Sequence, residues 1–123
     1  MRSNTLIVIA ASTALATVLI TSSTASAEPD PPGCAKGSLC AYGGEDQTGP
    51  LVLSTAVDWA GDVLFRSAFN NGTTHAGADH VELTYAVEGG TETDCLDHNP
   101  FGHYKGNAGE GVHLVKIVWR GSC

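Results

Sequence analysis

Short apolar runs separated by turn-forming residues fill the chain from residue 34 onward. The runs have the length of β-strands, and no long window carries apolar residues at helical spacing between capping residues. The predicted strands are Leu39–Tyr42, Leu51–Ser54, Val63–Phe69, His80–Val87, Thr91–Leu96 and Val112–Trp119, with a shorter one near Tyr104. The Gly-Gly pair between Val87 and Thr91 is typical of a hairpin turn. Short strands at this spacing predict an all-β fold, a small antiparallel sandwich.

Two of these strands differ in the faces that they bury. His80–Val87 alternates apolar and polar side chains, which is the pattern of a strand with one face in water. Val112–Trp119 is apolar on both faces, which is typical of a central strand that is covered on both sides. The side chains predicted to be buried between two sheets are Tyr42, Val63, Phe65, Leu83, Tyr85, Val115, Ile117 and Trp119. Glu82, Glu88 and Glu92 are predicted to stay in water.

The first residues have the features of a secretory signal. A positive residue, Arg2, precedes the uncharged apolar stretch Leu6–Ile20, and Ala25-Ser26-Ala27 has the small-x-small pattern that a signal peptidase cleaves. An uncleaved anchor is the alternative, but the apolar stretch is short for a membrane span. We therefore predict a signal peptide over 1–27, a proline-rich leader over 28–33 and one domain over 34–123. The protein is expected to be secreted, extracellular and free of the membrane after cleavage.

The charge balance limits the possible partners. The chain has 6 basic and 13 acidic residues, a formal net charge of −7, and no cluster of Lys or Arg. A groove that follows phosphates needs several basic side chains, so nucleic-acid binding is excluded. Anionic membrane surfaces are disfavoured for the same reason. We expect a monomer.

The four cysteines suit an exported domain with a small core, because an oxidising compartment permits disulfides. Three pairings are possible, and we favour Cys34–Cys40 together with Cys95–Cys123. The first would close a tight loop, and the second would tie the end of the chain to an interior segment. A zinc site is the chemical alternative, but it would be expected to use paired Cys-x-x-Cys spacings that this chain lacks.

Three segments resemble a known family. Cys34–Gly49, CAKGSLCAYGGEDQTG, resembles the opening of the bacterial metalloproteinase inhibitors of βγ-crystallin-like fold (peptidase inhibitor family thirty-six). Trp59–Asn71 and Tyr104–Gly106 are similar to later parts of that pattern. Gln47 and Asn99 stand where the two Greek-key motifs carry an aromatic residue. The resemblance implies a Greek-key sandwich whose Gly49 takes a positive φ, and a secreted inhibitor, not an enzyme, of thermolysin-like zinc proteases.

A candidate inhibitory loop follows the predicted strand Thr91–Leu96. Its candidate residues are Cys95, Leu96, Asp97, His98 and Phe101. Thermolysin-like proteases favour a large apolar residue after the cut bond, so Leu96 beside a disulfide is predicted to enter the protease pocket. A rigid, substrate-like loop spares the ordering cost of binding. Asp97 or His98 could ligate the protease zinc, whereas ordinary packing of Leu96 and Phe101 is the alternative.

A second candidate site resembles the calcium clamp of βγ-crystallin modules. The segment Asn70-Asn71-Gly72-Thr73-Thr74 offers amide, carbonyl and hydroxyl oxygens, the hard ligands that Ca²⁺ prefers. A weak calcium site at Asn70, Asn71 and Thr74 is therefore possible, and a plain turn is the alternative. The corresponding alternative function is a secreted structural or calcium-binding module with no protease target. Apart from calcium, we expect no cofactor.

Catalytic interpretations find little support in the sequence. The residues that could suggest a metal enzyme are His75, Asp79, His80, His98 and His103, and their spacing does not match a helical pair of ligands. No Gly-x-Ser-x-Gly motif is present. The nearby carboxylates Asp94 and Asp97 would need to face each other across a groove to act as a glycosidase. We therefore expect no enzymatic activity.

Overall fold

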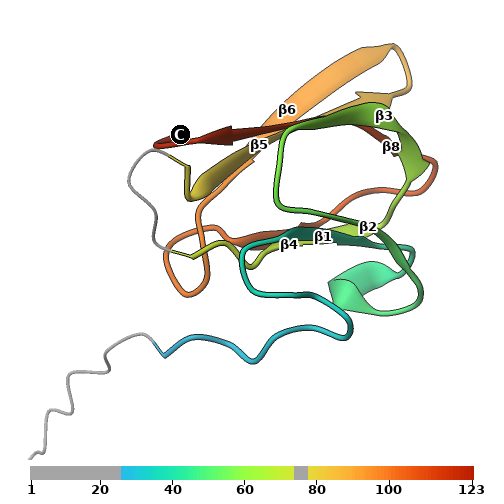
Figure 1. Cartoon of the computed structure of the whole chain (residues 1–123). Helices are drawn as coiled ribbons and strands as arrows, with labels where there is room; N and C mark the ends of the chain where they lie inside the picture. The colour runs from blue at the N-terminus through green and yellow to red at the C-terminus, as the bar shows by residue number, and fades with distance from the viewer. Residues whose placement is uncertain (1–25, 74–77) are drawn as a thin grey trace, which may run out of the picture.

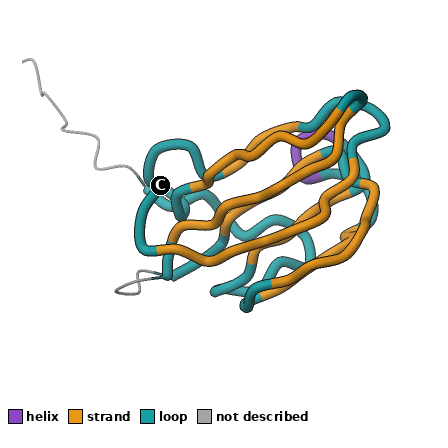
Figure 2. The backbone as a smooth tube through the Cα atoms, turned by 90° about the horizontal axis from the view of Figure 1, so that it is seen from above, coloured by secondary structure: helices purple, strands orange, loops and turns teal. Residues whose placement is uncertain are grey.

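The computed structural model describes residues 26–73 and 78–123, and within them the chain forms two antiparallel four-stranded sheets packed as a sandwich (Figure 1). The first sheet has the order β2-β1-β4-β7, and the second has the order β3-β8-β5-β6. The strands are β1 (Leu39–Tyr42), β2 (Leu51–Thr55), β3 (Trp59–Leu64), β4 (Ser67–Asn70), β5 (His80–Val87), β6 (Gly90–Leu96), β7 (Lys105–Asn107) and β8 (His113–Arg120). Figure 2, viewed from above, shows the strands of the second sheet side by side. The predicted all-β antiparallel sandwich is confirmed, whereas its Greek-key, βγ-crystallin-like topology stays a prediction.

Residues 1–25 of the predicted secretory signal lie outside the described residues, as do Thr74 and His75. The proline-rich leader packs on the domain. The Tyr42 hydroxyl donates a hydrogen bond of 2.8 Å to the Pro32 carbonyl, and the Cys34 amide donates one of 3.0 Å to the Pro31 carbonyl. The leader thus covers the outer face of the first sheet.

The prediction of a single strand over Val63–Phe69 is wrong. β3 belongs to the second sheet and β4 to the first, so the chain changes sheets between them. Phe65 is buried at this corner, and the Arg66 amide donates to the Tyr42 carbonyl over 2.8 Å. Apolar residues continue through the corner because it too faces the core. The hydrophobic pattern therefore could not reveal the change of sheet.

The face predicted for β8 is partly wrong as well. Leu114 and Ile117 are fully buried, whereas Val115 is only half-buried. Leu114 pairs with Tyr85 and Lys116 with Thr84, which leaves Val115 as the extra residue of a β-bulge. The bulge puts Leu114 and Ile117, which are three residues apart, on the same face. A strand in which every second side chain faces the core could not predict this.

The core lies between the sheets, and it includes Phe65, Leu83 and Ile117 as predicted. Val63, Tyr85 and Trp119 are only half-buried but pack against it. Tyr42 is buried, but it clusters with the Cys34–Cys40 disulfide and not with the main core. Side chains alternate along β1, so Leu39 and Ala41 face the core whereas Cys40 and Tyr42 face away from it. Glu88 and Glu92 are exposed as predicted, and Glu82 is half-buried beside Arg120.

Both predicted disulfides are confirmed. The Cα atoms are 5.9 Å apart in Cys34–Cys40 and 5.7 Å apart in Cys95–Cys123. The second bond reaches across β5, because β6 and β8 lie on either side of that strand. It ties the segment after β8 to the edge strand β6 and so opposes fraying of the chain end.

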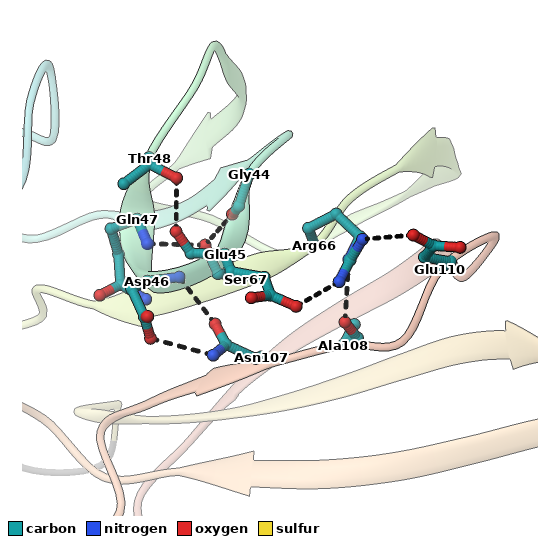
Figure 3. A network of polar contacts seen from close by, with 10 residues as sticks. All are labelled: Gly44, Glu45, Asp46, Gln47, Thr48, Arg66, Ser67, Asn107, Ala108 and Glu110. Carbon is teal, nitrogen blue, oxygen red and sulfur yellow. Dashed lines mark hydrogen bonds and ion pairs between the residues drawn. The ribbon is translucent and has the colours of Figure 1, made fainter.

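A 3₁₀ turn, η1 (Glu45–Gln47), occupies the place where the family pattern carries its second aromatic residue, and polar contacts hold it against β4 and β7 (Figure 3). The Ser67 hydroxyl donates to the Gly44 carbonyl over 2.7 Å and accepts from the Gln47 amide over 2.9 Å. Asn107 exchanges two hydrogen bonds with Asp46. Gly49 has the predicted positive φ, 72°. Side-chain hydrogen bonds therefore hold this turn, in which Gln47 replaces the aromatic residue of the family pattern.

Candidate interaction loop between the sheets

The segment 97–104, called the 97–104 loop below, joins the edge strand β6 of the second sheet to the edge strand β7 of the first. Of the five residues predicted for an inhibitory site, Asp97, His98 and Phe101 lie in this loop. Cys95 and Leu96 instead end strand β6. The structure thus keeps the predicted residues near one another but divides them between a strand and a loop.

Leu96 is not the exposed residue that the sequence led us to expect. Its side chain is 1% exposed and packs within the core, and its backbone pairs with Val81 of β5. β6 runs one residue past the crosslinked Cys95, so Leu96 keeps the inward orientation of the strand. The prediction that Leu96 enters a protease pocket is therefore wrong.

Phe101 is the apolar side chain that this region exposes. It is 53% exposed, although the ring lies 4.9 Å from the buried His98 ring, measured between centroids. The Phe101 amide donates a hydrogen bond of 2.8 Å to the His98 carbonyl and closes a tight turn. His98 therefore supports one side of Phe101 while the rest of the ring remains open to solvent.

Hydrogen bonds fix the loop at its base and at its centre. The Asp97 amide donates to the His103 carbonyl over 2.8 Å, which joins the two ends. The Asn99 side chain donates to the Glu28 carbonyl over 2.8 Å and accepts from the Glu28 amide over 3.0 Å. The Asn99 amide also donates to the Asn70 carbonyl over 3.3 Å. The loop is thus attached to the leader and to β4.

Two histidines and two aspartates connect the loop to the start of β5. His80 Nδ1 lies 2.7 Å from an Asp79 oxygen, and His80 Nε2 lies 3.2 Å from an Asp97 oxygen. His98 Nδ1 lies 3.1 Å from Asp97 and 3.5 Å from Asp79. The hydrogen bond from His80 is the main reason why the pKa of Asp79 is lowered, and burial opposes it. Within the described residues, no group of three or more His, Cys, Asp or Glu side chains is arranged to hold a metal ion.

Replacing Asp79 by Asn should destabilise the protein near pH 6 by on the order of 1 kcal/mol, or roughly 4–8 °C in Tm. A carboxyl whose folded pKa is lowered stabilises the fold above its ordinary value of 3.8, and that contribution disappears as the pH falls through the folded pKa. The Tm values of Asp79→Asn and the parent should therefore converge in acid. Thermal melts between pH 2.5 and pH 7 measure this.

Asp62→Asn is the matched control, because Asp62 pairs with His113 over 2.6 Å at the surface. Exposed ion pairs contribute little, so the control should change the Tm by less than about 2 °C at every pH. A difference between Asp79→Asn and the parent that stays constant down to pH 2.5 would contradict the assigned role of the charge.

The predicted calcium ligands have other partners. The Asn70 side chain donates to the carbonyls of Asp79 and Leu96 over 3.0 and 3.2 Å, and its oxygen accepts from the Gly72 amide over 2.9 Å. The Asn71 side chain donates to the Cys34 carbonyl over 3.3 Å. Because Thr74 lies outside the described residues, calcium binding stays a prediction. A bound ion would have to compete with these internal hydrogen bonds.

Sequence reasoning missed three residues that position the loop. Asn70, Asn99 and Glu28 hold it through hydrogen bonds, and Asn70 and Asn99 are buried. Asn99 is 71 residues from its partner Glu28 in sequence, so no local pattern could connect them. A cluster of Asn residues outside predicted strands was the only available signal, and it equally indicates turns.

No protein-family model, curated protein or solved structure matches the chain. The membership of the inhibitor family that the resemblance implies therefore stays a prediction. None of the helices in the described part of the chain is long and apolar enough to cross a membrane.

Proposed function

We propose that this protein is a secreted inhibitor of extracellular proteases, with thermolysin-like zinc proteases as the favoured targets. The 97–104 loop would bind the protease cleft as a substrate does, with Phe101 as the apolar residue in the pocket. The observation that carries the proposal is the half-exposed Phe101 ring on a loop that is hydrogen-bonded at its base and at its centre. The two disulfides fit the oxidising compartment that secretion provides.

The energetics favour a loop of this kind. Burial of a Phe side chain contributes about 1.5–3 kcal/mol, and a loop that is already ordered loses little conformational freedom on binding. Pro100–Phe101 supplies the peptide bond before a large apolar residue that such proteases favour. Asp97 could ligate the protease zinc only if its carboxylate left His80 and His98.

Phe101→Ala should raise the inhibition constant about 30-fold, a loss of about 2 kcal/mol. The reason is that the substitution removes the apolar ring from the pocket without changing the core. The test incubates the oxidised protein with a panel of zinc, serine and cysteine proteases and measures residual activity. Val57→Ala is the matched control, since Val57 is 68% exposed and far from the 97–104 loop in sequence. The control should inhibit as well as the parent.

Equal inhibition by Phe101→Ala and the parent would move the inhibitory site elsewhere on the molecule. Absence of inhibition by the parent across the panel would overturn the proposal. It would favour the alternative function, a secreted structural or calcium-binding module with no protease target. A Tm that rises when millimolar calcium is added would support that alternative directly.

A further inference from the structure

A cavity of about 150 Å³ lies between the two sheets, at the side where β6 and β7 form their edges. Its walls are mostly apolar and come from both sheets. They include the buried side chains of Phe65, Ala68, Leu83 and Leu96. The half-exposed side chains of Asp94 and His103 also line it, so solvent reaches the cavity on their side. This space is not used by the proposed inhibitory contact of Phe101.

The entrance of the cavity carries negative charge. Asp94 pairs with His103 over 2.9 Å and leaves part of its carboxylate open to solvent. Tyr85 also lines the cavity, and its pKa is raised first by burial and then by the nearby carboxylates of Glu92 and Asp94. A cation is therefore favoured at this entrance and an anion is disfavoured.

The walls suit an aromatic ring. An apolar cavity of comparable size binds a benzene-sized molecule in another protein. Phe65 and Tyr85 already pack edge to face here, with their ring centroids 6.3 Å apart. A third ring can add similar edge contacts, which contribute beyond the burial of area.

We propose that this cavity binds a small primary aromatic amine, with the ring between the sheets and the ammonium group at Asp94. The apolar walls hold the ring, and the carboxylate pairs with the charge at the entrance. A neutral ligand of the same shape would keep the contact of its ring with the walls and lose the ion pair with Asp94. A carboxylate ligand of that shape would face repulsion from Asp94.

Titration of the oxidised protein with benzylamine, followed by amide chemical shifts in NMR, tests the proposal. We expect a dissociation constant of about 1 mM or tighter, with the largest shifts at Ala68 and Leu83. Benzyl alcohol should bind about tenfold more weakly, and benzoate should not bind. Asp94→Asn should weaken benzylamine about tenfold and leave benzyl alcohol unchanged. The control Glu88→Gln, an exposed carboxylate outside the cavity, should change neither.

Ala68→Leu should fill the cavity and abolish binding of both ligands, and Leu83→Phe serves the same purpose if the first variant does not fold. Phe101→Ala should leave benzylamine binding intact, so failure of the inhibitor proposal would not affect this one. The proposal is overturned if benzylamine causes no shift at several millimolar. It is equally overturned if Asp94→Asn binds benzylamine as tightly as the parent does.

Discussion

Leu96→Ala is expected to lower the free energy of unfolding by about 3–5 kcal/mol. Leu96 is 1% exposed at the end of β6 and packs in the core between the sheets. It also lines the 150 Å³ cavity, so its truncation would enlarge a space that is already present. The disulfide at Cys95 and the pairing with Val81 hold the backbone in place. The fixed backbone therefore limits how far the surroundings can collapse into the gap.

Thermal or urea unfolding with the disulfides intact measures this loss. Leu64→Ala is the matched control, because Leu64 is 54% exposed on β3. The control should cost less than about 1 kcal/mol. A loss from Leu96→Ala as small as that of the control would show that Leu96 is at the surface. It would also restore Leu96 as a candidate for the protease pocket.

The strands could be predicted well where turn-forming residues mark their ends. His80–Val87 was predicted with the bounds that the structure has, because its alternation is clean and the Gly-Gly turn ends it. The strand over Val63–Phe69 was wrong because a corner that faces the core keeps the apolar pattern. Val115 was misplaced because a bulge changes the alternation without any change in composition. Such errors arise where the pairing of strands in the folded protein overrides the local alternation of apolar and polar residues.

The segment that carries the candidate residues was predictable, but the exposure of its side chains was not. The sequence located the segment after the strand Thr91–Leu96 and its crosslink at Cys95. The predicted strand ended at Leu96, as β6 does, but the sequence did not show that the Leu96 side chain faces the core while Phe101 is exposed. The partners that fix the loop, Asn70 and Glu28, lie far from it in sequence. Only the folded structure brings them together.

Asn70→Ala is expected to lower the free energy of unfolding by about 3 kcal/mol, because it leaves buried carbonyls without a donor. Asn70 is fully buried at the end of β4 in the first sheet. Its side chain donates to the carbonyl of Leu96, which ends β6 of the second sheet, and to that of Asp79, which precedes β5. One side chain therefore links the two sheets at the end of the sandwich that carries the 97–104 loop.

Asn70→Asp keeps one role of this side chain and removes the other. It keeps an oxygen that can accept from the Gly72 amide, but it cannot donate to either carbonyl. If the link between the sheets is what stabilises the protein, Asn70→Asp should lose at least as much stability as Asn70→Ala, because its buried carboxylate would also face two carbonyl oxygens. Asn107→Ala is the control, because Asn107 is exposed and its partner Asp46 is at the surface. That variant should lose less than about 1 kcal/mol.

The same substitution should also affect the loop. The Asn70 carbonyl accepts from the Asn99 amide, and the Asn70 amide donates to the Tyr104 carbonyl over 2.8 Å, so a displaced β4 end would release the 97–104 loop at two points. Hydrogen exchange at the Asn99 and Phe101 amides should therefore accelerate in Asn70→Ala at temperatures well below its Tm, since local opening then costs less free energy. Unchanged exchange at both amides, together with a full loss of stability, would show that Asn70 holds the sheets together without ordering the loop.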